Sequence, residues 1–216
     1  KLVDRRGIVY QVNSARPFSG RSISHHFLGS VSEIERFESG LLHGLQETFY
    51  QTGQRKSVVE YVDGRKTGLE THFHTNGAIA EQWTNVMGVR EGRFYRQIEN
   101  EFTEEGFYIE GKQHGTVRKT FANAEYEITE YVGGLPSTTD RYSPNGTVQQ
   151  HLKYNGGKHV LTEEFDSNGN LRERLEIKDG KIHGDHEIFT QDGRLWRINK
   201  YKYGTLISLG DIQQID

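Results

Sequence analysis

The fold is decided by a stretch that reads Asp63-Gly64-Arg65-Lys66-Thr67-Gly68, continues through Asn76-Gly77 and ends at Met87-Gly88. It contains a glycine turn, a second glycine four residues later, a strand pattern, an Asn-Gly turn, another strand pattern and the next glycine turn. The frame recurs at intervals of 24, 24, 23, 23, 23, 23 and 24 residues on Gly40, Gly64, Gly88, Gly111, Gly134, Gly157, Gly180 and Gly204. A fixed period of this length is typical of a repeat protein.

Three further sets of positions keep the same phase. The second glycine recurs as Gly20, Gly44, Gly68, Gly92, Gly115 and Gly184. The midway turn recurs at Gly29, Gly53, Gly77, Gly146, Gly169 and Gly193. Three residues before the first glycine stand Phe37, Tyr61, Asn85, Tyr108, Tyr131, Tyr154, Ile177 and Tyr201, among which only the asparagine is out of class. Because this slot also accepts an isoleucine, we expect its tyrosines to pack in the core rather than bind a sugar.

The segments between turns predict strands. Leu171, Leu175 and Ile177 share one parity while Arg172 and Arg174 share the other, which is the period-two alternation of a half-buried strand. The Asn-Gly pairs favour type I′ hairpin turns at the midway positions. No apolar stripe with helical spacing occurs. The sequence therefore predicts an all-β fold, namely an elongated, twisted, single-layer antiparallel meander of about eight hairpin repeats of 23–24 residues.

Composition agrees with one repeat array. Only 33% of the residues are hydrophobic, which is low for a compact globule but suits repeats that bury apolar surface only against their neighbours. We expect residues 1–19 to form an N-terminal segment with one strand, residues 20–207 the hairpin array, and residues 208–216 a C-terminal tail.

Several functional classes are disfavoured. The chain has no Cys, which excludes disulfides and thiolate metal sites, and its net charge of −3 disfavours nucleic acid as a partner. No apolar run is long enough to span a membrane. The only methionine is Met87, so we expect a segment to be missing from the front, either a targeting segment or a stretch removed at an arbitrary boundary.

Catalytic and metal sites are not indicated. His72 and His74 share a strand parity, but no third ligand follows at fixed spacing, so we expect no metal site and no cofactor. The chain has no Gly-x-Ser-x-Gly motif and no Ser, His and Asp in phase for nucleophilic catalysis. We therefore expect a protein that is not an enzyme.

Acidic residues give the candidate binding surface. Residues 99–130 are rich in glutamate, and Glu81, Glu104 and Glu127 each stand seven residues before a first glycine. Since equivalent positions stack, we expect these three to form a ladder of like charges with steps of about 10 Å. Such a ladder is either a solvated face or a docking strip for a basic partner, with a tryptophan nearby as an anchor. The predicted partner-binding residues are Glu81, Trp83, Glu99, Glu101, Glu104, Glu105, Tyr108 and Glu127.

The repeat text resembles a known family. The segments at 61–68, 75–79, 167–171 and 178–184 are similar to bacterial MORN-type repeats of the YwqK-like antitoxin or immunity family. The opening residues 4–10 and 17–20 also resemble the first repeat of secreted members. The glycine pattern is specific for architecture and loose for function, because MORN-like repeats serve many partners. The second glycine is absent at Thr138 and Leu161, which departs from the pattern.

The resemblance implies an immunity protein that binds and neutralises a cognate secreted toxin, such as an interbacterial effector delivered by type VI secretion. The implied partner is an envelope-acting lipase or similar protein with a basic active-site mouth. The implied location is the periplasm or an outer-membrane lipid anchor, with the cytoplasm as the alternative. A periplasmic or cell-surface scaffold that binds glycans or lipid headgroups is the alternative function.

Overall fold

The structure is a computed structural model that describes residues 1–210. Its described residues form β-strands, turns and loops and no helix, and all strand pairs are antiparallel, so the predicted all-β hairpin fold is confirmed. The chain divides into two compact units. Unit 1 comprises residues Lys1–Glu99 and Phe107–Lys112, and unit 2 comprises Asn100–Gly106 and Gln113 onward.

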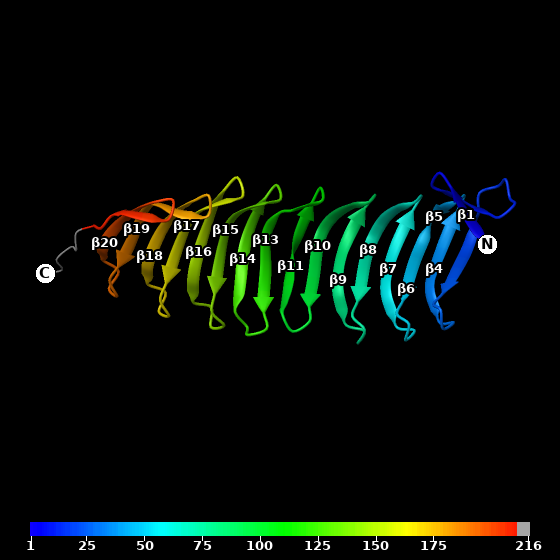
Figure 1. Cartoon of the computed structure of the whole chain (residues 1–216). Helices are drawn as coiled ribbons and strands as arrows, with labels where there is room; N and C mark the ends of the chain where they lie inside the picture. The colour runs from blue at the N-terminus through cyan, green and yellow to red at the C-terminus, as the bar shows by residue number, and fades with distance from the viewer. Residues whose placement is uncertain (211–216) are drawn as a thin grey trace. The chain divides into compact units, whose positions relative to one another are not determined.

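In unit 1 a small N-terminal hairpin precedes a meander in which consecutive strands lie side by side (Figure 1). Its strands are β1 (Leu2–Arg5), β2 (Ile8–Gln11), β3 (Gly20–His25), β4 (Val31–Glu38), β5 (Leu41–Leu42), β6 (Gly44–Phe49), β7 (Arg55–Val62), β8 (Arg65–Phe73), β9 (Ile79–Val86) and β10 (Val89–Ile98). Strands β11 (Phe102–Ile109) and β12 (Lys112–Gln113) contribute residues to both units.

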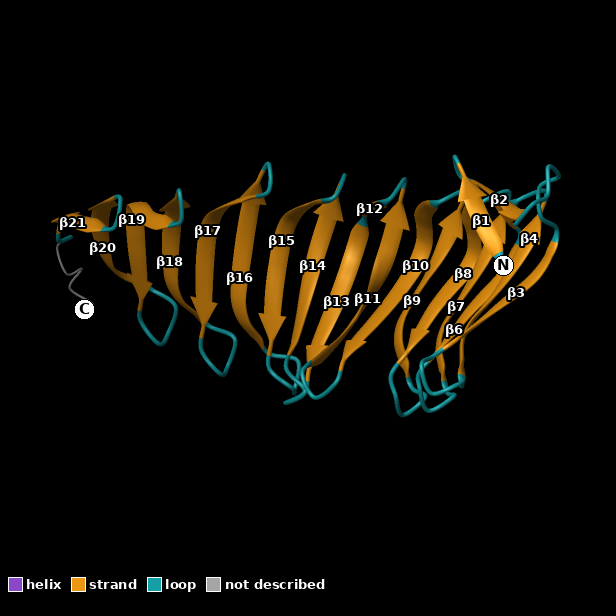
Figure 2. Ribbon diagram, turned by 45° about the vertical axis from the view of Figure 1, so that its right-hand side comes forward, coloured by secondary structure: helices purple, strands orange, loops and turns teal. Residues whose placement is uncertain are grey.

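Unit 2 continues the same pattern, again as a single layer of neighbouring strands (Figure 2). Its strands are β13 (Gly115–Phe121), β14 (Tyr126–Val132), β15 (Leu135–Tyr142), β16 (Val148–Asn155), β17 (Lys158–Phe165), β18 (Leu171–Lys178), β19 (Lys181–Phe189), β20 (Leu195–Lys202) and β21 (Thr205–Ser208). The division into residues 1–19, 20–207 and 208–216 stays a prediction, and residues 211–216 of the tail lie outside the described part.

The turn types differ from the prediction. At the first glycine, Asp63 and Gly64 both have positive φ (49° and 77°), which is the signature of a type I′ turn. At the midway turn only Gly77 is left-handed (φ 87°), and its N–H donates to the His74 carbonyl at 2.9 Å. The midway connection is therefore a three-residue loop that ends in a glycine bulge. Placing type I′ at Asn-Gly was wrong, because a type I′ turn needs two left-handed residues. That pair occurs at the first glycine, where the preceding residue is left-handed even with side chains as different as Asp63 and Met87.

The second glycine lies at a bulge. The register of β8 on β7 shifts between Val58 and Glu60, where Gly68 has a φ of 63°. A Cβ added at Gly68 would lie 2.6 Å from Oε2 of Glu60, so a side chain there would displace this carboxylate. Glycine is thus favoured at this position by its backbone conformation, while the exposed Glu60 side chain could move aside.

The core is thin. Among the described residues, the buried hydrophobic side chains are Val59, Phe94 and Val117, at 4%, 7% and 3% exposure. The phased tyrosines, expected to be core residues, are only half-buried; they are Tyr61, Tyr108, Tyr131, Tyr154 and Tyr201. A single-layer sheet has no second layer to cover them, so each packs mainly against its neighbours along the sheet.

Candidate partner-binding face

The candidate site lies on one face of strands β8, β9 and β10 in unit 1. Side chains alternate between the two faces of a strand, and residues directly opposite each other in neighbouring strands share a face. The register pairs Glu70 with Trp83, His72 with Glu81, and Trp83 with Phe94. We call the face that carries these residues the Glu70 face. In the described part of unit 1, no helix and no second sheet covers it over β8–β10 (Figure 1).

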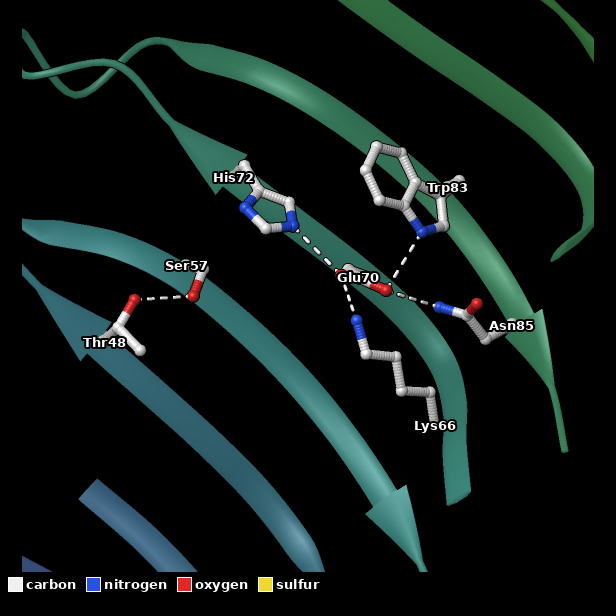
Figure 3. Close-up of polar contacts among 7 residues, drawn as sticks. All are labelled: Thr48, Ser57, Lys66, Glu70, His72, Trp83 and Asn85. Atoms are coloured by element: carbon white, nitrogen blue, oxygen red, sulfur yellow. Dashed lines mark hydrogen bonds and ion pairs between the residues drawn. The ribbon is translucent and has the colours of Figure 1, made fainter. Parts of the chain in front are cut away.

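Glu70 is the centre of this face, with only 2% of its surface exposed. Its Oε1 accepts hydrogen bonds from Lys66 Nζ at 2.7 Å and His72 Nε2 at 3.0 Å. Its Oε2 accepts from Trp83 Nε1 at 3.0 Å and Asn85 Nδ2 at 2.9 Å (Figure 3). A carboxylate offers about four lone-pair positions, so every acceptor position of Glu70 is used.

The environment keeps Glu70 ionised. Burial raises the pKa of this carboxyl, but hydrogen bonds from His72, Lys66 and Asn85, together with the charge of Lys66, outweigh burial and lower the pKa to about 2. An ionised carboxylate only accepts hydrogen bonds, so His72 must carry its proton on Nε2. Glu70 therefore fixes the orientation of four side chains around it.

Trp83 is held from both neighbouring strands. The His72 ring on β8 stacks on the indole with centroids 5.3 Å apart and an angle of 30°. From β10, the guanidinium of Arg90 lies 4.0 Å from the Trp83 ring centroid and 5.6 Å from that of Tyr108. The Tyr108 ring in turn packs on Phe94 at 5.0 Å. The result is a connected aromatic and cationic platform with an exposed Arg90 at its surface.

Some predicted residues join this platform and others do not. Trp83 and Tyr108 are part of it, and Glu81 is opposite both His72 and Arg96 on the same face. Glu99, Glu101 and Glu105 are exposed. The register also places Glu105 and Glu104 on opposite faces of β11.

The predicted ladder of like charges is not continuous. In unit 2, Lys119 stands between Glu104 and Glu127 in the cross-strand register, and Glu127 is opposite Arg141. Arg141 Nε donates to Glu127 Oε1 at 3.0 Å. Equivalent repeat positions recur on every second strand, so a residue of the intervening strand lies between each two of them. Because that residue is basic here, unit 2 carries a row of alternating charges.

The prediction did not include Glu70, Lys66, Asn85 and Arg90. One signal was present, since Asn85 is the residue that replaces the usual aromatic three positions before the first glycine. Its amide now donates to Glu70, and Asn85 itself is only 3% exposed. His72, considered above as a metal ligand, is a Glu70 partner instead. No group of three metal-ligating residues was found in the described part of the chain.

The fold and this face define a repeat protein built from β-hairpins, with an uncovered and pre-ordered sheet surface. One segment, residues 42–63, matches the MORN repeat variant family. It covers β6 and β7 of unit 1, and it supports a MORN-type repeat protein. No curated protein matches the sequence. MORN repeats generally bind proteins or lipids and are generally not enzymes. No helix in the described residues is long and apolar enough to cross a membrane.

Proposed function

We propose that this chain is a non-enzymatic protein-binding repeat protein that uses the Glu70 face to grip its partner. We further propose that it is an immunity protein, which neutralises a cognate secreted bacterial toxin. The observation that carries the binding proposal is the Trp83 platform, fixed by Glu70, His72 and Arg90 on a face that no other layer covers at this point. The immunity role rests on the resemblance of the repeats.

Pre-ordering supports a binding role. Binding loses free energy when rotamer-rich side chains become ordered, and a surface that is already ordered avoids this loss. Trp, Tyr and Arg are the residues most enriched at binding hot spots. Trp83, Tyr108 and Arg90 bring all three types into one contact group. The Glu70 face therefore has the composition and the rigidity of a protein contact.

The chemistry of Glu70 does not favour catalysis. A general acid or base works best with a pKa near the working pH. Glu70 has a pKa of about 2 and directs both oxygens to donors inside the sheet. Its role is to position other side chains.

The exposed acids supply a second element. Glu99, Glu101 and Glu105 are exposed, and we propose that they attract a basic mouth on the toxin, as in an envelope-acting lipase. Charge complementarity of this kind mainly raises the association rate. Glu104 and Glu127 contribute less than the sequence suggested, because Lys119 lies between them. The proposed location is the periplasm or an outer-membrane lipid anchor, with the cytoplasm as the alternative.

Co-purification and toxicity together test the proposal. The tagged chain should retain one protein at a fixed ratio from extracts of its source, and cells that express this captured protein should survive only with the chain present. The variant Glu101→Lys with Glu105→Lys should slow association, with an effect that shrinks as salt rises. A captured protein that is harmless to cells would overturn the immunity role and leave the binding role. Retention of no protein would overturn both.

One observation favours the alternative, a scaffold for glycans or lipid headgroups. A cavity of about 1020 Å³ in unit 1 lies between the β1 strand and the β3 and β4 strands. Its lining includes Arg21, Ser22, Ser24, Glu35 and Arg65, which could hold a small polar ligand. Retention of the chain on cell-wall material or lipid headgroups, lost in the Arg21→Ala variant, would support this alternative.

A further inference from the structure

The tip of the β3–β4 turn exposes two bulky apolar side chains in unit 1. Phe27 is 102% exposed and Leu28 is 74% exposed. They occupy the two middle positions of a turn in which the Gly29 N–H donates to the His26 carbonyl at 2.9 Å. Exposing two adjacent apolar side chains gives up their burial, so their presence calls for a reason outside the turn itself.

The other midway turns show that the turn does not need apolar residues. The same bond closes five further turns with a glycine at the last position. Their middle pairs are Gln51-Thr52, Thr75-Asn76, Pro144-Asn145, Ser167-Asn168 and Gln191-Asp192. None of these pairs contains a bulky apolar side chain, although the hydrogen bonding is the same. The β3–β4 turn therefore differs from the other midway turns in its side chains, Phe27 and Leu28, and not in its backbone hydrogen bonding.

The tip is fixed in place. The His26 N–H donates to the Ser30 carbonyl at 2.8 Å, and the His26 Nε2 lies 3.0 Å from the Phe49 carbonyl oxygen. Ser30 Oγ also donates to the Gln51 carbonyl at 3.1 Å. These bonds tie the β3–β4 turn to the β6–β7 turn beside it, so Phe27 and Leu28 are presented without a large ordering cost.

The surroundings of the tip are basic. Neither residues 21–32 nor residues 49–59 contain an Asp or a Glu, whereas Arg55 and Lys56 begin the β7 strand directly after the adjacent turn. Arg55 pairs with Glu47 at 3.1 Å, and Lys56 is exposed. A contact surface that matches this tip has an apolar pocket with an acidic rim.

A protein pocket fits this tip better than a bilayer does. A single myristoyl chain gives only marginal membrane binding, and the side chains of Phe27 and Leu28 together contain fewer carbons than such a chain. Recognition of anionic lipid also uses clusters of about four to eight Lys and Arg residues, more than this edge supplies. In contrast, one or two apolar side chains in a protein pocket are enough to act as a hot spot.

We propose that the Phe27–Leu28 tip is a second anchor, which inserts into an apolar, acid-rimmed pocket of the protein partner. This rests on the proposed function in that the partner is a protein, but it uses a surface separate from the Glu70 face. The test variant Phe27→Thr with Leu28→Asn gives the tip the sequence of the Thr75-Asn76 turn. The matched control, Gln51→Thr with Thr52→Asn, makes the same change in the adjacent turn.

Photo-crosslinking followed by titration decides the proposal. A benzophenone side chain at position 27, compared with one at position 76, should cross-link one protein in source extracts. That protein, once identified and purified, should bind the tip variant about thirtyfold more weakly than the parent chain, as expected for a hot spot. The control variant should bind within about twofold of the parent, since surface changes outside a hot spot are near neutral.

Three results would overturn the proposal: no cross-link specific to position 27, unchanged affinity in the tip variant, or tip-dependent binding to phosphatidylcholine vesicles that contain phosphatidylglycerol. The last result would make a bilayer the occupant. The Trp83→Ala variant separates this proposal from the proposed binding face. Affinity lost only in the tip variant would contradict binding through the Glu70 face and support the tip as an anchor. Affinity lost only in Trp83→Ala would contradict the tip as an anchor and support the Glu70 face.

Discussion

Unit 1 surrounds one buried carboxylate with four hydrogen-bond donors, whereas unit 2 spreads charge along rows. Glu70 on β8 is 2% exposed and accepts four hydrogen bonds. Thr162 on β17 occupies the position that matches Glu70. Glu70 pairs with Trp83 and Thr162 pairs with Leu175, and both of these partners stand five residues before a first glycine. Thr162 is also buried, and among the described residues its side chain bonds to one partner, His159, with 2.9 Å between the side-chain atoms.

On the opposite face of unit 2, ion pairs run from strand to strand. Arg174 donates to Glu163 at 2.8 Å and to Glu187 at 2.9 Å, and these carboxylates raise its pKa. The Arg174 side chain is 40% exposed, so water screens these pairs. The difference shows that a buried carboxylate can order four side chains around it, whereas the partly exposed pairs of Arg174 are ordinary surface charge.

The largest expected effect is the loss of Glu70. Glu70→Ala leaves Asn85 and the Trp83 N–H without their buried acceptor and Lys66 without its counter-charge, so the free energy of unfolding should fall by about 3–5 kcal/mol. Thr162→Ala should cost only about 1 kcal/mol. Urea unfolding measures both, with Trp83 fluorescence reporting unit 1 and Trp196 fluorescence reporting unit 2. Equal losses in the two variants would remove the distinction between the units.

Acid should act on unit 1 through Glu70. Its pKa in the folded chain is about 2, below the ordinary 4.5. The stabilisation is therefore complete above about pH 4.5 and is lost as the pH falls toward 2, by about 3 kcal/mol in total. Unfolding experiments across this range on the parent chain and on Glu70→Gln should show that the variant lacks this component. A parent and a variant with the same pH profile would contradict the assignment.

Arg174 should matter less and depend on salt. Replacing Arg174 with Met removes both ion pairs but keeps an aliphatic side chain, and we expect a loss of about 1 kcal/mol that shrinks at high salt. The loss in Glu70→Ala should change little with salt, because burial limits screening. Denaturant curves at low and high salt make the comparison. If the Arg174 replacement lowered the free energy of unfolding by more than about 3 kcal/mol at any salt concentration, unit 2 would also contain a charge group that behaves as buried.

The smallest effect should be common to both units. Met87 in unit 1 and Tyr203 in unit 2 have positive φ (52° and 49°), a conformation that asparagine tolerates better. Met87→Asn and Tyr203→Asn should each stabilise the chain by about 0.5–1 kcal/mol. Thermal unfolding measures the gain. Similar gains would identify turn chemistry as shared by the units, and a loss in either variant would show that the replaced side chain contributes packing.

The sequence predicted the hairpin repeats well because glycines at turns and bulges are local requirements. It misplaced the type I′ turns because the residue before the first glycine varies, from Asp63, which is usual in such turns, to Met87, which is not. It also predicted a ladder of like charges, because the repeat pattern shows which positions are equivalent but not which residue of the intervening strand lies between them. Lys119 occupies that place in unit 2.

The site was only partly predictable. Trp83 and Tyr108 were named as contacts, but their connection passes through Arg90, and this follows only from cross-strand register. Glu70 had no signal of its own, since a glutamate on a strand is usually solvated. The exchange of the usual aromatic for Asn85 was the single local departure that pointed to a buried acceptor nearby.

The dissociation rate of the partner from tryptophan variants tests the central claim most directly. The chain has a matched control, since Trp83 lies on the Glu70 face of unit 1 and Trp196 lies on β20 of unit 2. With the captured partner immobilised and folding confirmed by circular dichroism, Trp83→Ala should dissociate about thirtyfold faster than the parent chain. Trp196→Ala should dissociate at the parent rate. An unchanged rate in Trp83→Ala, or a larger effect in Trp196→Ala, would contradict the Glu70 face as the binding surface.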